Sequence, residues 1–221
     1  MRRTVTFDLF SALIDSRTGG AAAFGRLSRD RGWSVTGVQL YDAWDPLNKA
    51  AQRDCRSWLP WREPATTALS RAYDELGLDG DAPADVETLA TSMTDWPLWP
   101  DVADGLPRLA AHHRVGLLSN VDDDMFARTA AARLVDRDVA LTSERLRAYK
   151  PHPDIYLRAR DAVQQLVHVA TSARDVRGAL EAGIPTVRLR RPGHELDPDG
   201  PRPASEVETV DGLAGAIADL G

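Results

Sequence analysis

Polar side chains that could act together stand at the ends of apolar runs at three places along the chain: Asp8, Ser119 with Asn120, and Asp175, which follows the run 166–170 after a short polar segment. Short runs rich in Val, Leu and Ile are typical of parallel strands that are buried on both faces. The carboxyl ends of such strands share one edge of a sheet, where α/β folds place their ligands. A carboxylate at that edge is a candidate nucleophile, and Asp8 is the first of these.

Lys150 adds the positive charge that such a site needs. It precedes Pro151, and Lys49 is the only other lysine in a chain whose remaining fixed cations are arginines. A lysine retained in such a chain indicates a need for a compact ammonium group. That group would hold a nearby carboxylate ionised. The alternative is a surface lysine without a role.

The other polar residues also have structural interpretations. Asp8 could cap the turn that follows it, and Ser119 and Asn120 are common turn formers. Ser172 and Asp175 have the spacing of a capping box, with Asp where Glu or Gln is usual. Both interpretations stay open for each residue.

Short apolar runs that are typical of strands alternate along the chain with segments that have the periodicity of helices. The expected strands cover residues 5–10, 115–119, 138–142, 166–170 and 185–190. The helices expected between them cover residues 124–134, 152–164 and 175–182. This order predicts an α/β fold with a Rossmann-like parallel sheet and right-handed crossovers. Phe10, two residues beyond Asp8 on the first strand, should share its face.

A segment of different character interrupts this pattern after the first strand. Between Thr18 and Asp95 no buried strand is evident, and the helices expected there are residues 21–31, a helix that starts at N-cap Asp45 with Pro46 in its first position, and residues 64–76. We therefore predict a core domain of residues 1–17 and 96–221 with an inserted all-helical cap domain of residues 18–95. Residues 192–205 have the composition of a loop, and residues 211–220 that of a short closing helix.

The composition excludes several kinds of partner. The chain has 221 residues, 43% of them hydrophobic, which suffices for one sizeable core. A net charge of -6 without a basic patch argues against nucleic acid. No stretch is long enough to span a membrane, and none resembles a signal peptide. Because Cys55 is the only cysteine, no disulfide forms within the chain, and we expect a cytoplasmic protein.

The order of Asp8, Ser119, Lys150 and Asp175 along these elements resembles the haloacid dehalogenase (HAD) superfamily. The helical insertion resembles the cap that this superfamily carries after its first strand. The resemblance implies a hydrolase with an aspartate nucleophile and a covalent aspartyl-ester intermediate.

Two positions indicate the branch of the superfamily. Its phosphatases carry a second Asp two residues after the nucleophile, which protonates an alkoxide leaving group; this chain has Phe10 there. They also bind magnesium through an acidic residue four positions before the Asp that corresponds to Asp175, where this chain has Thr171. A halide leaving group needs neither a proton nor a metal ion. The chain thus resembles the 2-haloacid dehalogenase branch, which implies metal-independent hydrolysis of a small 2-haloacid without a cofactor.

The resemblance also implies a role for each residue of the site. Asp8 displaces the halide, Lys150 keeps Asp8 ionised, and Asp175 positions the water that hydrolyses the ester, helped by Ser172. Hydrogen bonds from Ser119 and Asn120 hold Asp8 or the substrate carboxylate. Further substrate contacts are expected from Phe10, Tyr156 and Lys49.

The chain departs from the family pattern in ways that leave the substrate open. Ala12 replaces the usual Thr after the nucleophile, and no cap arginine aligns clearly with the one that grips the substrate in the family. Two alternatives therefore remain: a magnesium-dependent phosphatase-type hydrolase of a small phosphate ester, and a non-catalytic binding protein on the same fold. We expect a small, anionic substrate in each case, and the resemblance suggests a homodimer.

Overall fold

The computed structural model describes residues 2–220, and a parallel sheet of six strands forms the centre of this part of the chain. The strands are β1 (Thr4–Phe7), β2 (Arg114–Ser119), β3 (Ala140–Thr142), β4 (Leu166–Ala170), β5 (Thr186–Leu189) and β6 (Ser205–Val207). They lie in the order β3-β2-β1-β4-β5-β6. Phe7 on β1 pairs with Leu117 on one side and with Val169 on the other. The predicted α/β fold is confirmed, and its first strand is central.

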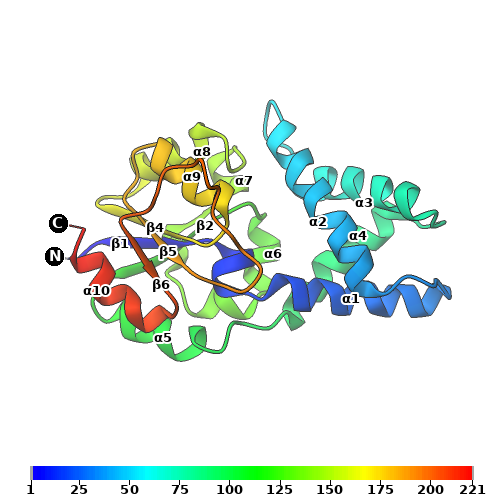
Figure 1. The fold of residues 1–221 in the computed structure, drawn as a ribbon, viewed down its shortest axis with the longest axis horizontal. Helices are drawn as coiled ribbons and strands as arrows, with labels where there is room; N and C mark the ends of the chain where they lie inside the picture. Colours follow the sequence, from blue (N-terminus) through cyan, green and yellow to red (C-terminus); the bar gives the residue numbers. More distant parts are fainter. Residues whose placement is uncertain (1, 221) are drawn as a thin grey trace.

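Helices cover both faces of the sheet (Figure 1). The helices that alternate with the strands, or follow the last one, are α5 (Val102–Ala110), α6 (Asp123–Arg128), α7 (Ser143–Leu146), α8 (Pro153–Ala162), α9 (Ala173–Glu181) and α10 (Leu213–Ala218). In the view of Figure 1, α7, α8 and α9 lie above the sheet and α5 and α10 below it. The sheet is therefore the middle of three layers, as expected for buried parallel strands.

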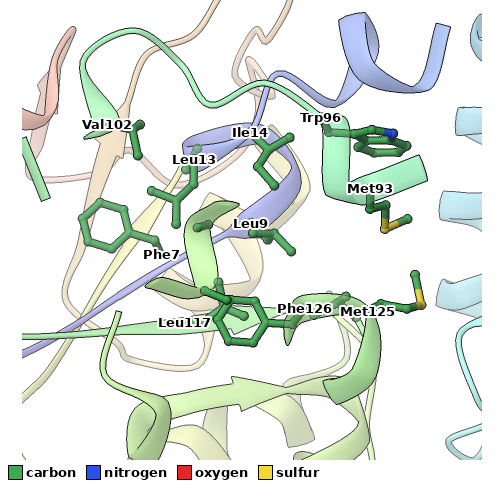
Figure 2. Close-up of a cluster of buried hydrophobic side chains, with 14 of the residues drawn as sticks. Phe7, Leu9, Leu13, Ile14, Met93, Trp96, Val102, Leu117, Met125 and Phe126 are labelled. Atoms are coloured by element: carbon green, nitrogen blue, oxygen red, sulfur yellow. The ribbon is translucent and has the colours of Figure 1, made fainter. Parts of the chain in front are cut away.

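Two buried apolar clusters hold these layers together. One gathers Leu118, Ile155 and Ala179 on the side of α8 and α9. The other runs from the opposite face of the sheet toward the inserted helices, and Figure 2 shows Phe7, Leu13, Ile14, Met93 and Trp96 among its members. This second cluster fixes the turn that follows β1, which carries the first residues of the site.

The inserted segment forms four helices that pack on one another beside the sheet (Figure 1). They are α1 (Ser16–Arg31), α2 (Gly37–Asp54), α3 (Arg62–Leu76) and α4 (Ala82–Ser92), and a short turn, Met93–Asp95, ends the segment. The helical character predicted for residues 18–95 is thus observed, whereas the domain boundaries at residues 17 and 96 stay a prediction.

The chain enters and leaves the inserted segment through two short extended segments that pair with each other. Ile14 and Leu98 form an antiparallel bridge. The Asp15 amide donates to the Pro97 carbonyl at 2.9 Å, and the Trp99 amide donates to the Leu13 carbonyl at 3.0 Å. Both crossings therefore lie side by side at the edge of the core.

The first strand is shorter than predicted, because the chain leaves the sheet at Asp8. The Asp8 side chain accepts from the Ser11 amide and caps a π-helical turn, Leu9–Leu13. Phe10 lies on that turn, so the prediction that it shares a strand face with Asp8 was wrong. Apolar composition alone does not distinguish a strand from a buried turn.

Two other expected elements also differ. The helix expected at N-cap Asp45 begins earlier, at Gly37, because Thr36 and Gln39 form a capping box, and Pro46 lies inside it. The loop expected over residues 192–205 leads into β6, which pairs with β5 in parallel through Val187 and Ser205. Within residues 2–220, no helix has the length and apolar character needed to cross a membrane.

Candidate active site

Asp8 lies where β1 ends, and four donors surround its carboxylate. Oδ1 accepts from Lys150 Nζ at 2.8 Å and from the Ser119 hydroxyl at 3.0 Å. Oδ2 accepts from the Ser11 amide at 3.1 Å and from the Ser11 hydroxyl at 2.6 Å. Asp8 therefore does what both of its interpretations predicted, since it caps the turn and also faces the other site residues.

Lys150 joins two carboxylates and a carbonyl. Its ammonium donates to Asp8 Oδ1, to Asp175 Oδ2 at 2.6 Å and to the Leu118 carbonyl at 2.9 Å. Only 2% of the residue is exposed, so these three acceptors replace its hydration. The interpretation as a surface lysine is excluded.

Asp175, in the first turn of α9, is held by three side chains. Oδ2 accepts from Lys150 and lies 3.1 Å from His168 Nε2, while Oδ1 accepts from the Tyr156 hydroxyl at 2.8 Å. The Ser172 side chain makes no capping hydrogen bond to this helix. The capping-box interpretation of Ser172 and Asp175 is therefore excluded.

The two carboxylates are ionised despite their burial. Burial raises the pKa of Asp8 and the charge of Lys150 lowers it; the lowering contributions prevail, and the pKa lies below its usual range. Burial likewise raises the pKa of Asp175, but the charges of Lys150 and His168 and their hydrogen bonds hold it well below the usual value. The site thus presents two ionised carboxylates with one ammonium group between them.

Ser119 and Asn120 have different partners. Ser119 contacts Asp8, as predicted, whereas Asn120 accepts from the Lys150 amide at 2.7 Å and donates to the Lys150 carbonyl at 2.9 Å. Asn120 Nδ2 also donates to Gln52 of α2 at 2.9 Å. Asn120 therefore positions the Lys150 loop and links the core to the inserted helices, and it makes no hydrogen bond to Asp8.

A cavity of about 610 Å³ opens above these residues between the sheet edge and the inserted helices. Its floor includes Asp8, Ser119, Lys150 and Asp175. Its apolar wall consists of Phe10, Tyr41, Trp44, Trp61, Met93, Trp96 and Trp99. Two tryptophans of the insertion, Trp44 and Trp61, thus line the cavity together with Phe10, and Phe10 packs edge-on against Trp96 with ring centroids 5.9 Å apart.

Of the remaining residues predicted to contact the substrate, some line the cavity and one does not. Lys49 and Ser172 line the cavity, and the Lys49 ammonium is paired with Asp45 at 2.5 Å. Tyr156 is fully buried behind Asp175 and is not part of the cavity wall. Its hydroxyl supports Asp175, so the structure does not bring it to the position expected of a substrate contact.

Three residues of the site were not predicted from the sequence. Ser11 holds Asp8, His168 holds Asp175 from within β4, and Arg174 lines the cavity beside Asp175. The position of Arg174 directly before Asp175 was a signal for its place in the site. His168 stands inside an apolar run, where a buried imidazole needs polar partners, and that was a signal as well.

A comparison of sequences identifies the family. The model of the haloacid dehalogenase-like hydrolase family matches residues 2–183, which include the four predicted catalytic residues. The chain belongs to this family of hydrolases.

Relatives within the haloacid dehalogenase-like hydrolases include two kinds of enzyme. An (S)-2-haloacid dehalogenase of Xanthobacter autotrophicus is 30% identical over 88% of this chain and 78% of the relative. A phosphoglycolate phosphatase of Escherichia coli O157:H7 is 27% identical over 85% of this chain and 81% of the relative. The solved structure of the L-2-haloacid dehalogenase of Xanthobacter autotrophicus with chloropropionic acid covalently bound has the same fold, with a TM-score of 0.83 and 18% identity over the whole of both chains.

The residues of this haloacid dehalogenase-like hydrolase do not fit a magnesium ion. The Lys150 ammonium lies between Asp8 and Asp175, where a cation shared by the two carboxylates would lie. Thr171, in the position that should supply a third acidic ligand, is buried and donates to the Leu189 carbonyl at 2.8 Å. Among residues 2–220, no group of three His, Cys, Asp or Glu side chains is arranged to bind a metal.

Proposed function

We propose that this hydrolase removes halide from a small 2-haloacid without a metal ion, through an ester formed on Asp8. The observation that carries the proposal is the position of Lys150 between Asp8 and Asp175. One ammonium group keeps the nucleophile ionised and holds the second carboxylate beside it. Neither task then requires a divalent cation.

In the first step, a carboxylate oxygen of Asp8 attacks the carbon that bears the halogen. A C–O bond forms, the carbon–halogen bond breaks, and the halide leaves with the bonding electrons. Halide is a weak base, so Phe10 in place of a general acid is no obstacle. The apolar wall around Phe10 excludes water from a nucleophile that is more reactive when poorly solvated.

In the second step, water attacks the carbonyl carbon of the ester, and Asp175 accepts its proton. Lys150 and Ser119, which donate to Asp8 Oδ1, stabilise the charge that develops on the adduct. The adduct expels the alkoxide, which takes the proton from Asp175, and the carboxylic acid of Asp8 loses its own proton. Each turnover yields one 2-hydroxyacid, one halide and one proton.

The similarity to phosphoglycolate phosphatases supports a second candidate, a magnesium-dependent phosphatase acting on a small phosphate ester. It requires an acid in place of Phe10 and a metal ligand in place of Thr171. Phosphate release that depends on magnesium and stops in excess chelator would favour it over dehalogenation.

The test is halide release from racemic 2-chloropropionate and 2-bromopropionate in excess chelator. We expect release by the parent protein, none by Asp8→Asn, and full release by Asp104→Asn, a matched change on the exposed face of α5. In H₂¹⁸O with enzyme in excess over substrate, the label should enter Asp8 and be absent from the first 2-hydroxyacid. Absence of halide release by a folded parent protein would overturn the proposal, and label in the first product would overturn the ester mechanism.

A further inference from the structure

Many charged side chains line the cavity, but most of them are already in ion pairs with one another. Its lining contains four permanent cations, Arg17, Lys49, Lys150 and Arg174. The carboxylates that line it are Asp8, Asp15, Asp42, Asp45 and Asp175. An anionic substrate therefore meets no overall positive field, and its binding depends on a particular cation that is free to receive it.

Three of the four cations are paired with carboxylates, and one of these is Lys49 with Asp45. Lys150 lies between Asp8 and Asp175. Arg17 makes two hydrogen bonds to Asp42, at 2.9 and 2.6 Å. A cation that is already neutralised attracts a further anion only weakly.

Arg174 is different, because within residues 2–220 no carboxylate lies within ion-pair distance of its guanidinium. Its guanidinium donates to a neutral acceptor, the Lys49 carbonyl of α2, at 3.3 Å from Nη1. A guanidinium has five N–H donors in a fork that matches a carboxylate, so most of them stay available. The half-buried side chain is also partly shielded from water, which strengthens a charged hydrogen bond.

The neighbourhood of Arg174 adds further donors. It lies in the first turn of α9, where backbone N–H groups point away from the helix and favour an anion. Ser172, the residue that precedes this helix, also lines the cavity and makes no side-chain hydrogen bond to the turn. Arg174 and Ser172 thus face the same cavity as Asp8, from the segment that follows β4, the neighbour of β1 in the sheet.

We propose that Arg174 is the residue that binds the carboxylate of the substrate, and that it does so from the core rather than from the inserted helices. The proposal deepens the proposed function, since it assigns the anionic end of the same substrate. It also explains how the chain manages without a clear arginine in the insertion. The specificity that follows is for monocarboxylates, because within residues 2–220 Arg174 is the one permanent cation of the lining without a carboxylate partner.

The test separates binding from turnover by using carboxylic acids that carry no halogen. Propionate and hexanoate are titrated against the protein beside propionamide and hexanamide, with tryptophan fluorescence as the readout, because four tryptophans line the cavity. We expect the parent protein to prefer each acid to its amide. Arg174→Gln should weaken acid binding about 10- to 100-fold, the loss typical of a hydrogen bond to a charged group, and leave amide binding unchanged. Arg174→Lys should restore part of the difference.

Two further variants and one control complete the design. Arg177→Gln, a matched charge change on the outer face of the same helix, should leave acid binding unchanged. Arg17→Gln tests the competing cation and should have a smaller effect than Arg174→Gln. Thermal unfolding of Arg174→Gln measures how much stability is lost with the hydrogen bond to the Lys49 carbonyl.

Several results would overturn the assignment. These are equal binding of acids and amides by the parent protein, an equal loss of both in Arg174→Gln, or a larger loss in Arg17→Gln. If the parent protein releases no halide but still binds acids through Arg174, the proposed dehalogenation fails while the carboxylate site stands.

Discussion

His168 Nε2 lies 3.1 Å from Asp175 Oδ2, and both side chains are buried. Because an ionised carboxylate can only accept, Nε2 carries the proton of this hydrogen bond. On the other side of the ring, Nδ1 lies 3.1 Å from the Thr6 hydroxyl of β1. The imidazole therefore connects the first strand of the sheet to the carboxylate that is proposed to activate water.

Replacing His168 should impair the site more than the fold. In His168→Phe, Asp175 loses one of three donors, and we expect kcat to fall about 10- to 100-fold, the effect of one hydrogen bond to a charged group, with a smaller change in KM. His168→Gln retains an N–H donor and should recover part of the rate. Steady-state kinetics with 2-bromopropionate measures both. An equal loss of kcat in the two variants would mean that the hydrogen bond from His168 to Asp175 does not support the rate.

Replacing Asp175 should separate the two chemical steps. Asp175→Asn removes the acceptor for the proton of water but leaves Asp8, Lys150 and Ser119 in place, so ester formation should outlast ester hydrolysis. A rapid-quench experiment is expected to show a burst of about one halide per active site followed by slow release, which is the kinetic sign of a covalent intermediate. Mass spectrometry should find the added group on Asp8. Slow release without a burst would argue against the assigned role.

Asp122 should make the stability of the protein depend on pH near neutrality. Its Oδ2 accepts from the Trp61 amide at 2.8 Å while Oδ1 is buried without a hydrogen-bond partner, and burial raises the pKa of the carboxyl to about 6 from an ordinary value of 3.8. The folded state therefore binds this proton more tightly than the unfolded state does. The resulting stabilisation is complete below about pH 3.8 and is lost as the pH rises through about 6.

Asp122→Asn removes this titration and is expected to stabilise the protein at pH 7.5. The gain over the parent protein should be larger at pH 7.5 than at pH 5 by about 1 kcal/mol, as measured by denaturant unfolding at both values. Asp124→Asn, a change to the exposed carboxylate that pairs with Arg62, serves as the comparison. A gain that is the same at both pH values would show that Asp122 does not titrate between them.

The size of the cavity predicts activity on acids longer than propionate. A volume of about 610 Å³ is in the range that holds drug-sized ligands, and Trp44, Trp61 and Trp99 lie along its wall. Each methylene that becomes buried contributes about 0.8 kcal/mol. We therefore expect kcat/KM to rise about fourfold per methylene from 2-bromopropionate to 2-bromohexanoate. Constant or falling values along this series would mean that the substituent does not reach the apolar wall.

The buried strands and the residues at their ends were predictable because they rest on strong constraints. A parallel sheet brings the ends of β1, β2 and β4 to one edge, so the convergence of Asp8, Ser119 and Asp175 followed from topology. The place of Lys150 beside these carboxylates was also foreseeable, since a lysine beside a proline is unusual in this arginine-rich chain.

The local geometry was harder to predict. Nothing in an apolar run shows that β1 would turn into a helix at Leu9, which moved Phe10 off the strand. The roles of Arg174 and Asn120 depend on contacts with α2, a helix far away in the sequence. Contacts of this kind arise from tertiary packing, which a single sequence does not record.

The paired crossings at Ile14 and Leu98 have a consequence for how this protein could change over generations or in the laboratory. Because both ends of the helical segment leave the core at one place, the whole insertion is connected to the sheet in the same way as a single surface loop. A replacement segment whose ends lie equally close could be exchanged there without altering strand register. The apolar wall that Trp44 and Trp61 contribute can therefore be varied separately from the core residues that carry the reaction and the carboxylate site.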